Sequence, residues 1–522
     1  MGSALRGGGN EGFTTVIKTV DGGLIAGGYS SSDISGDKSQ TSQGKNDYWV
    51  IKSNKNGIKL WDYRYGGTHD DYLNRIIATN DGGYLLAGSS RSDIGGDKTQ
   101  ASRGDRDYWI VKITNTGEKQ WDKRYGGSGY DELKKVIQLA TGDFILAGYS
   151  NSPAGGDKSQ HSQGGNDFWL VKINSAGTKI WDKRYGGNLN ETLTGMVETT
   201  DGGFLLGGSS VSGKSGDKSQ VSRGRSDFWL IRVDKNGQKL WDKTYGGSGQ
   251  DEAYSLGRHG NEFFIAGQSD SPADGDKTTG TQGGLDFWFL KLNSSGGKVW
   301  DKRFGGSQDD ELRASIQTQD GGYILAGKSF SGKSGNKTQE SRGSSDFWIV
   351  KTDQNGMYQW DKHYGGNGAE ELRAVTQTPD GGLLLGGKSD SGVSGDRTQP
   401  NQGGMDYWLV KVPAETKPMA AARETIKTEA SETPAELVNL HVYPNPFHDK
   451  LTIRFTLPET QTSTVQVYDS QGREVATLFQ GKAQAHQTYQ LEWQADSKAA
   501  GMYSVQLRTP AKRLQQKLLL IR

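Results

Sequence analysis

The sequence contains no cysteine among its 522 residues. Disulfides, thiolate metal sites and thiol nucleophiles are therefore excluded, and the chain can fold in an oxidising or a reducing compartment. A long apolar run is also missing, so we expect no transmembrane segment. The start of the chain, Met1 to Gly8, likewise lacks the apolar core of a signal peptide.

An excess of charge of either sign is absent as well. The chain has 62 basic and 61 acidic residues, which gives a formal net charge of +1. Nucleic acids and anionic membranes bind clustered basic surfaces. Neither is therefore an expected partner.

Catalytic and metal-binding motifs are scarce too. The seven histidines show no metal-ligand spacing, and no Gly-x-Ser-x-Gly elbow joins a strand to a helix. Paired carboxylates such as Asp310-Glu311 suit acid–base catalysis, but similar pairs recur along the chain, which weakens that interpretation. We expect no cofactor and no catalytic residue set. Calcium remains an open alternative, because the Ser-Gly-Asp segments resemble calcium loops only loosely.

What the chain does have is a repeat. An Asp-aromatic-Trp tripeptide returns seven times, at intervals of 60 residues with one interval of 59. A period of this size predicts a repeat architecture. The copies begin at Asp47, Asp107, Asp167, Asp227, Asp286, Asp346 and Asp406.

One repeat unit contains four predicted strands, which we call A to D. Strand A covers 73–79, the apolar strand B covers 84–88, the aromatic and β-branched strand C covers 107–113, and strand D covers 119–125. Asp81-Gly82-Gly83 and Asn115-Thr116-Gly117 are typical tight turns between them. Four short antiparallel strands with tight turns predict one blade of a β-propeller.

The tripeptide itself is predicted to hold the blades together. Neighbouring side chains on a strand point to opposite faces, so Tyr108 and Trp109 are expected to pack on different neighbouring blades. The C strands number seven, but the D-strand tryptophan occurs only six times, and counting back 60 residues from Trp61 gives Met1. We therefore predict seven blades, with residues 2–6 supplying the last strand of the seventh.

The repeat pattern stops after Val412. Residues 413–436 are rich in Ala, Glu, Thr and Pro and have no aromatic residue, which predicts a flexible linker. Seven strand candidates follow in 437–522, a number typical of an immunoglobulin-like β-sandwich without its cysteine pair. The expected fold is all-β, with a seven-bladed propeller over 1–412 and a small β-sandwich over 437–522.

Both parts resemble known families. Ser-Gly-Asp-Lys-Ser-Gln at 215–220 and Trp-Asp-Lys-Arg-Tyr-Gly-Gly at 181–187 resemble the 60-residue propeller repeats of large secreted Bacteroidota proteins. Residues 437–522 resemble the type A sorting domain of type IX secretion. The residues that carry this second resemblance are Tyr443, Pro444, Asn445, Pro446, Gly472, Gly501, Tyr503, Lys517 and Arg522.

The second resemblance implies export across the outer membrane of a Gram-negative bacterium, through contact between 437–522 and the secretion machinery. It also implies cleavage within 413–436 and a mature chain that is released or attached to the cell surface. Such chains begin with a signal peptide, so its absence here is expected to reflect a truncated or processed start.

Two sets of acids are candidates for a ligand site. In a blade, the B–C loops and the D–A connections should emerge on one face. Acids of the D–A connection, one per blade just before strand A, are expected to ring the channel mouth: Glu11, Asp71, Glu132, Glu191, Glu252, Glu311 and Glu371. The second set lies in the B–C motif Gly-Asp-Lys-[Ser/Thr]-Gln: Asp37, Asp97, Asp157, Asp217, Asp276 and Asp396, with Asn336 in the sixth unit.

These acids form either a rim for cations or polar ligands, or internal partners for loop backbone groups and neighbouring charges. We favour the second interpretation, because seven nearly identical loops fit packing or weak multivalent binding, whereas a catalytic site must break the symmetry. The leading hypothesis is a secreted or surface-attached, monomeric and non-enzymatic propeller that binds a glycan or a protein. The alternatives are a polysaccharide lyase or hydrolase with channel-mouth carboxylates, and a purely structural surface protein.

Overall fold

A computed structural model describes residues 2–5, 7–378, 380–414, 439–443, 447–485, 487–495, 498–510 and 513–521. The chain divides into two compact units, Met1–Lys417 and Pro418–Arg522. Almost all of the expected linker, 413–436, falls outside the described residues. Within the described part of the chain, no helix has the length and apolar character needed to span a membrane.

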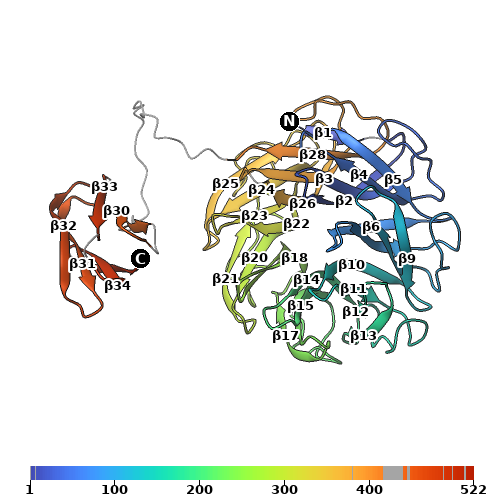
Figure 1. Ribbon diagram of the computed structural model, residues 1–522, viewed down its shortest axis with the longest axis horizontal. Coiled ribbons are helices and arrows are strands. Elements are labelled where there is room, and N and C mark those ends of the chain that lie inside the picture. Colours follow the sequence, from blue (N-terminus) through green and yellow to red (C-terminus); the bar gives the residue numbers. More distant parts are fainter. Residues whose placement is uncertain are drawn as a thin grey trace. The chain divides into compact units, whose positions relative to one another are not determined.

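The first unit is a seven-bladed β-propeller made of seven four-stranded antiparallel sheets (Figure 1). The A strands lie innermost and are β2 (Glu11–Lys18), β6 (Asp71–Ala78), β10 (Asp131–Gln138), β14 (Glu191–Glu198), β18 (Asp251–His259), β22 (Asp310–Gln317) and β26 (Glu370–Gln377). The B strands are β3 (Leu24–Ser30), β7 (Tyr84–Ser90), β11 (Phe144–Ser150), β15 (Phe204–Ser210), β19 (Glu262–Ser269), β23 (Tyr323–Ser329) and β27 (Leu383–Ser389).

The remaining two strands of each blade complete the sheets outward. The C strands are β4 (Asp47–Ser53), β8 (Asp107–Ile113), β12 (Asp167–Ile173), β16 (Asp227–Val233), β20 (Asp286–Leu292), β24 (Asp346–Thr352) and β28 (Asp406–Val412). The D strands are β5 (Lys59–Tyr65), β9 (Lys119–Tyr125), β13 (Lys179–Tyr185), β17 (Lys239–Tyr245), β21 (Lys298–Phe304), β25 (Tyr358–Tyr364) and β1 (Gly2–Leu5). The seven-bladed fold predicted from the repeat is confirmed.

Blade seven is closed by the N-terminal strand, as the sequence offset predicted. Strand β1 pairs antiparallel with β28, from Gly2 opposite Val410 to Leu5 opposite Tyr407. The first and last strands of the propeller therefore share one sheet, in the order β1-β28-β27-β26. The ring is held shut by a backbone ladder between residues about 400 positions apart in the chain.

The hydrogen bonds of the A–B turn explain why the hairpin of strands A and B turns at the Asp-Gly-Gly sequence. In blade two, the amide of Gly82 donates to the carbonyl of Thr79 at 2.9 Å, and Gly82 has a φ of 83°. Asp81 Oδ1 accepts hydrogen bonds from the Thr79 hydroxyl at 2.5 Å and the Gly83 amide at 3.2 Å. The Asp-Gly-Gly sequence thus supplies both the positive φ and the side-chain acceptor that this turn needs.

Aromatic pairs join each blade to the next. Tyr48 of blade one packs on Trp109 of blade two, and Tyr108 packs on Trp169 of blade three, with ring centroids 4.8 Å apart in both pairs. Tyr407 and Trp49 close the cycle at 5.0 Å. The prediction that the two rings of the tripeptide face different blades is confirmed. The other pairs are Phe168–Trp229, Phe228–Trp288, Phe287–Trp348 and Phe347–Trp408.

A hydrogen bond fixes the tryptophan within its own blade. Trp109 Nε1 donates to Asp122 Oδ2 of strand D at 3.0 Å, and the same carboxylate accepts the amide of Thr99. This explains the recurring Trp-Asp dipeptide of strand D. The indole is fully buried, and it therefore keeps its polar atom satisfied.

A glycine follows the D strand in blades one to six, and a close contact requires it. A Cβ atom on Gly126 would lie 2.0 Å from Asp107 Oδ1, and the equivalent glycines meet the equivalent aspartates in the same way. No side chain fits there. Gly126 is therefore needed for close approach to the carboxylate and not for a positive φ.

The second unit is a small β-sandwich. One sheet has the order β29 (Asn439–Tyr443), β30 (Lys450–Thr456) and β33 (Thr488–Gln494). The other contains β32 (Glu474–Ala483), β31 (Gln461–Asp469), β34 (Gly501–Arg508) and β35 (Arg513–Leu520). All seven strands predicted in this region are present, and Phe447, Trp493 and Tyr503 lie in its core.

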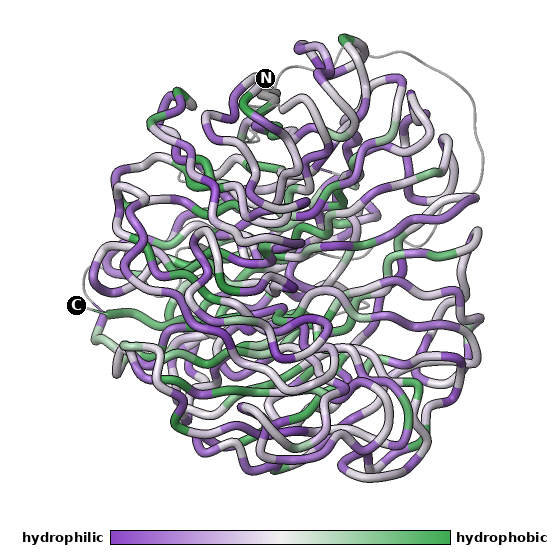
Figure 2. Tube along the Cα trace, turned by 90° about the vertical axis from the view of Figure 1, so that its right-hand side faces the viewer, coloured by the Kyte–Doolittle hydropathy of each residue, from purple (hydrophilic) through white to green (hydrophobic). Residues whose placement is uncertain are grey.

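Hydropathy follows the strands in both units. Figure 2 shows hydrophobic stretches along the strands and hydrophilic stretches in many of the loops. In the propeller the B and C strands are buried along nearly their whole length. The core of the propeller therefore lies between blades.

Candidate ligand site in the central channel

The two loop sets predicted to share a face do so. In blade two, the B–C loop residue Asp97 donates its amide to the carbonyl of Gly66, which belongs to the D–A connection leading from blade one. The corresponding bond recurs from Asp157 to Gly126 and from Asp217 to Gly186. The candidate acids of both sets therefore lie near one another, and their individual contacts decide what they do.

The B–C acids bind the neighbouring blade. Asp97 Oδ2 accepts hydrogen bonds from Arg64 Nη1 at 2.7 Å and from the amide of Gly66 at 3.2 Å. Asp157, Asp217, Asp276 and Asp396 are likewise bound by arginines and glycine amides of the preceding blade. Asp37, in blade one, accepts Lys59 Nζ through its carbonyl oxygen at 2.6 Å. These contacts favour the interpretation in which the B–C acids are internal partners for backbone groups and neighbouring charges.

The strand A acids do not form the single equivalent ring that we expected. Glu11, Asp71 and Glu191 are the first residues of their strands, with Glu11 opposite Ser30. Glu132, Glu252, Glu311 and Glu371 are the second residues, with Glu132 opposite Tyr149. Side chains alternate along a strand, so the two groups point to different surroundings. The seven acids predicted from the sequence therefore belong to two different positions of strand A.

The first-position acids are buried loop anchors. Glu11 is 1% exposed, and its Oε1 accepts the hydroxyls of Ser30 and Ser32. Asp71 accepts the amide of Gly67 and the hydroxyl of Ser92. Burial raises the pKa of both carboxyl groups. The equivalents missed in the sequence are Asp131, Asp251, Asp310 and Glu370.

The second-position acids lie on the inner side of the blades, and each has polar partners there. Glu132 accepts the hydroxyl of Tyr149 at 3.0 Å and forms an ion pair with Arg106 at 3.5 Å; Lys134 and Tyr130 also bind it. Burial alone would raise the pKa of Glu132, but Lys134, Tyr130 and Arg106 hold it below the ordinary value. Glu132 is therefore ionised at neutral pH and is a poor proton donor.

The other three acids of this group are paired in the same manner. Glu311 binds Arg313 and Lys328, and Glu371 binds Arg373 at 2.7 Å and Lys388 at 3.3 Å. Glu252 instead accepts hydrogen bonds from neutral groups, namely Gln250, Tyr254 and Gln268. Within the described residues, no three acidic or histidine side chains come together as a metal-binding group.

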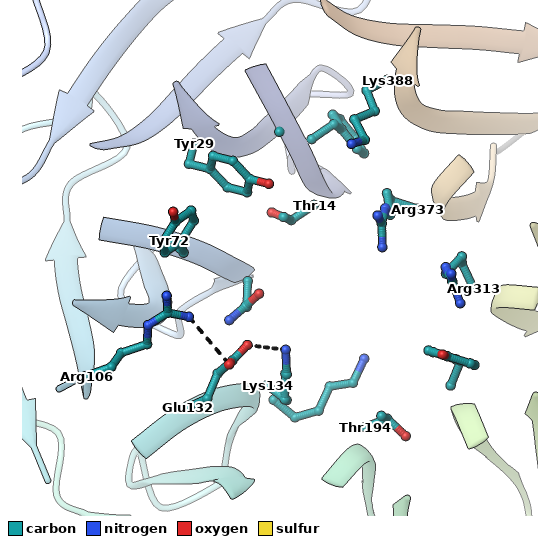
Figure 3. A pocket seen from close by; sticks show the side chains of 15 residues that line it. Thr14, Tyr29, Tyr72, Arg106, Glu132, Lys134, Thr194, Arg313, Arg373 and Lys388 are labelled. Atoms are coloured by element: carbon teal, nitrogen blue, oxygen red, sulfur yellow. Dashed lines mark hydrogen bonds and ion pairs between the residues drawn. The ribbon is translucent and has the colours of Figure 1, made fainter. Parts of the chain in front are cut away.

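The channel at the centre of the propeller contains a cavity of about 370 Å³ that all seven blades line (Figure 3). Six lining residues are basic and one, Glu132, is acidic. Figure 3 shows labelled side chains from separate blades directed toward a common opening. The basic residues are Arg106, Lys134, Lys135, Arg313, Arg373 and Lys388.

A β-bulge in each A strand places four of these six side chains, Lys134, Lys135, Arg313 and Arg373, at the channel. In blade three the register jumps from Leu133 to Lys135, so Lys134 has no partner on β11, and Lys134 and Lys135 both line the cavity. A bulge places two successive residues on one strand opposite a single partner and redirects their side chains. The bulged residues of the seven blades are Thr14, Asn74, Lys134, Thr194, Tyr254, Arg313 and Arg373.

Tyrosine rings hold two of the channel arginines in place. The Arg106 guanidinium lies 4.7 Å from the ring centroid of Tyr72 and 5.0 Å from that of Tyr130. Arg313 lies 4.5 Å from the ring centroid of Tyr254. Stacking of this kind restricts the rotamers of arginine and orients its guanidinium for hydrogen bonds to a carboxylate or similar anion.

The sequence did contain a signal for this lining. The third residue of strand A is apolar in every unit, and the fourth changes from Thr to Asn, Lys, Tyr and Arg. That variable column lies at the bulge. We overlooked it because the predictions started from acids that recur, and the channel is where the repeat differs from unit to unit.

The predicted sorting residues are placed only in part. Gly472, with a φ of 78°, makes the β31–β32 turn, and Tyr503 donates its hydroxyl to the carbonyl of Ala499. Gly501 begins β34, and Lys517 lies within β35. Pro444, Asn445, Pro446 and Arg522, together with the side chains of Tyr443 and Lys517, lie outside the described residues.

Comparison with protein families matches residues 441–521 to the family described as "Secretion system C-terminal sorting domain". The C-terminal unit is therefore a type IX secretion sorting domain, and such a domain directs a chain to the cell surface or exterior. The match covers the second unit only. It says nothing about the propeller.

Among curated proteins, the chain is 24% identical over 214 residues to the regulatory protein FlaEY of Caulobacter vibrioides. The similarity covers 38% of this chain and spans only 22% of the length of FlaEY.

Among solved structures, a mutant of the Synechocystis apocarotenoid oxygenase aligns with a TM-score of 0.38 at 9% identity, over 73% of this chain and 88% of that one. The cobalt-substituted form gives 0.37 at 10% identity over the same shares. Similarity at this level carries no argument about function.

Proposed function

We propose that this protein is an exported, non-enzymatic binding protein whose propeller takes an anionic ligand in its central channel. The observation that supports this most directly is the composition of the cavity, where six basic residues and one acid face a common space although the whole chain has a net charge of only +1. A cleft lined by one sign of charge concentrates ligands of the opposite sign.

The contrast between loops and channel strengthens the proposal. The B–C acids repeat from blade to blade and are engaged by arginines of the neighbouring blade. The bulged residues differ in almost every blade. A site that recognises one ligand must depart from the repeat symmetry, and the channel does so. Its volume, about 370 Å³, is within the ordinary range for a small ligand or the end of a chain.

An anion-binding role also fits the geometry better than the enzymatic alternative. A lyase or hydrolase needs carboxyl groups poised to give or take a proton near neutral pH. Glu132 and Glu371 are paired with basic residues that lower their pKa values. Their charge positions the basic side chains instead, and arginines held in this way can form two hydrogen bonds to one carboxylate.

The test is a calorimetric titration of the full chain with oligogalacturonate, an acidic oligosaccharide, and with a neutral oligosaccharide of equal length. We expect binding of the acidic sugar only, and a loss of at least about tenfold in affinity for the double variant Arg313→Ala, Arg373→Ala. Lys214→Ala, on an exposed loop, is the matched control and should bind normally.

Two outcomes would contradict the proposal. Equal binding of acidic and neutral sugars would show that charge does not select the ligand. Turnover of the polysaccharide that disappears in Glu132→Gln but not in Glu252→Gln, Glu311→Gln or Glu371→Gln would favour the enzymatic alternative.

A further inference from the structure

Two basic residues on adjacent innermost strands differ from the basic residues that are paired with glutamates at the channel. Arg75 in β6 and Lys135 in β10 occupy the same position, directly after the bulge of their strands. Both are partly exposed, and Lys135 lines the cavity. The other five units carry Thr15, Gly195, Ser255, Ala314 and Ala374 at this position, so the pair is not a product of the repeat.

Neither residue has a counter-charge among the described residues. Arg106 and Lys134 are paired with Glu132, and Arg373 and Lys388 with Glu371. Among the described residues, Arg75 and Lys135 form no hydrogen bond or ion pair through their side chains. An enclosed cation without an acceptor is costly, because it has lost part of its hydration and gained nothing in exchange.

The two positive charges also oppose each other. Burial, followed by the charges of Arg75 and Lys134, lowers the pKa of Lys135 to about 7. Burial lowers the pKa of Arg75 as well. The neighbouring stretch of β14, from Thr194 to Met196, has no titratable side chain. These residues of β14 therefore do not offset the repulsion.

We propose that Arg75 and Lys135 form a subsite for one anionic group, a carboxylate, sulfate or phosphate, of the ligand that enters the channel. An anion between them would replace the missing acceptor for both side chains and cancel their repulsion. The arrangement is destabilising for the empty protein and favourable for the complex, as expected of a preorganised binding site. This subsite rests on the proposed function only in sharing its channel.

The subsite makes binding depend on pH. Lys135 must be protonated to bind an anion, so affinity is expected to fall as pH rises from 6 to 8, through the pKa of about 7. Arg75 stays charged over that range. The anion raises the pKa of Lys135 on binding, so each binding event above pH 7 should take up a proton.

Thermal unfolding of the full chain tests the subsite without requiring knowledge of the natural ligand. The probes are sulfate, phosphate and acetate at equal ionic strength, with chloride as reference, at pH 6 and pH 8. The variants are Arg75→Met and Lys135→Met, which keep the length of the side chain, and Lys214→Met is the matched control.

In the absence of the probe anions, both channel variants should unfold at a higher temperature than the wild type, because the repulsion is gone. The probe anions should raise the unfolding temperature of the wild type more than that of either variant, and more at pH 6 than at pH 8. General salt effects on stability are common to all proteins compared and cancel in that difference. An equal gain in wild type, Lys135→Met and Arg75→Met would overturn the subsite.

The titration with oligogalacturonate separates this inference from the proposed function. If that sugar binds equally well to wild type and Lys135→Met, the channel takes an anion and the subsite is refuted. If the sugar does not bind but the anion-specific stabilisation is lost in the variants, the subsite stands and the ligand is a different anion.

Discussion

The tryptophan of the repeated tripeptide shows how much one residue can contribute to this fold. Trp109 is fully buried, packs on Tyr48 of the preceding blade, and donates to Asp122 in its own blade. It therefore connects two blades and two strands at once. The ring contact recurs at all seven interfaces, and the hydrogen bond to a strand D aspartate recurs in blades one to six. Each interface therefore depends on one indole.

We predict that Trp109→Ala lowers the free energy of unfolding by about 3–5 kcal/mol, because the removed indole leaves a cavity between two blades and takes away one hydrogen bond to Asp122. Urea denaturation followed by circular dichroism measures the loss. Lys214→Ala serves as the exposed control and should unfold as the wild type does. A Trp109→Ala protein with unchanged stability would contradict the burial of this indole.

Residue-level prediction from the sequence succeeded for packing and failed for the site. The alternation of side chains along strand C was enough to assign Tyr108 and Trp109 to different neighbours. The roles of Glu11 and Glu132 were confused, because a shift of one residue in a strand moves a side chain to the opposite face. Only the ladder of paired residues distinguishes the two positions.

At the scale of single elements, the strand that closes the ring is the least like its equivalents. Strand β1 has the sequence Gly-Ser-Ala-Leu, whereas β9 contains Trp121, Asp122 and Arg124. It pairs with β28 through four residues. At this seam the backbone hydrogen bonds between β1 and β28 must therefore replace the side-chain contacts that strand D makes in the other blades.

Deletion of Gly2–Leu5 is predicted to lower the free energy of unfolding by about 2–4 kcal/mol, through the loss of ladder hydrogen bonds to β28. The uncovered edge of β28 should also promote association between molecules. Differential scanning calorimetry and light scattering measure the two effects. A Ser3→Thr protein, which keeps strand propensity, is the control. If the deletion variant unfolds at the same temperature as this control and stays monomeric, the pairing of β1 with β28 is not needed for stability.

Element boundaries were predictable where turns and aromatic residues mark them. Strand C and strand D were predicted at 107–113 and 119–125, and the structure has them at Asp107–Ile113 and Lys119–Tyr125. Strand A was predicted to begin at Leu73 and begins at Asp71. Its bulge was not predicted, since a register shift depends on the partner strand and leaves no local signature in a short polar segment.

At the scale of the whole molecule, the propeller buries carboxyl groups at its blade interfaces. Asp47, Asp107, Asp167, Asp227 and Asp286 are each 0% exposed. Burial raises the pKa of each to about 6. Five separate interfaces therefore respond to pH in the same direction.

The propeller is predicted to become more stable as pH falls from 7.5 to 5. A carboxyl whose pKa is about 6 when folded and about 3.9 when unfolded binds protons preferentially in the folded state between those values. Each such group should add about 1 kcal/mol of stability over this interval. Lys135, with its pKa lowered to about 7, opposes the trend, and so does His363, whose pKa is lowered by burial. Below pH 4 the trend should reverse, because the pKa values of Asp21 and Asp81 are lowered to about 2.

Urea denaturation at pH 5.0 and pH 7.5 measures this dependence. Asp107→Asn is the matched variant, since it keeps the shape and the acceptor for the Arg103 amide while removing one titrating group. Its stability should change less between the two pH values. A wild type that is more stable at pH 7.5 than at pH 5.0 would refute the prediction.

The seam between β1 and β28 also has a consequence for how the protein is made. Strand β1 is synthesised before β2 to β28, and it has no partner until β28 has been added, some 400 residues later. The sorting unit begins only a few residues beyond β28. A chain whose synthesis stops before β28 therefore lacks both the partner strand of β1 and the domain that directs export. Because the sorting unit is synthesised after β28, a propeller that lacks β28 also lacks the unit that directs export.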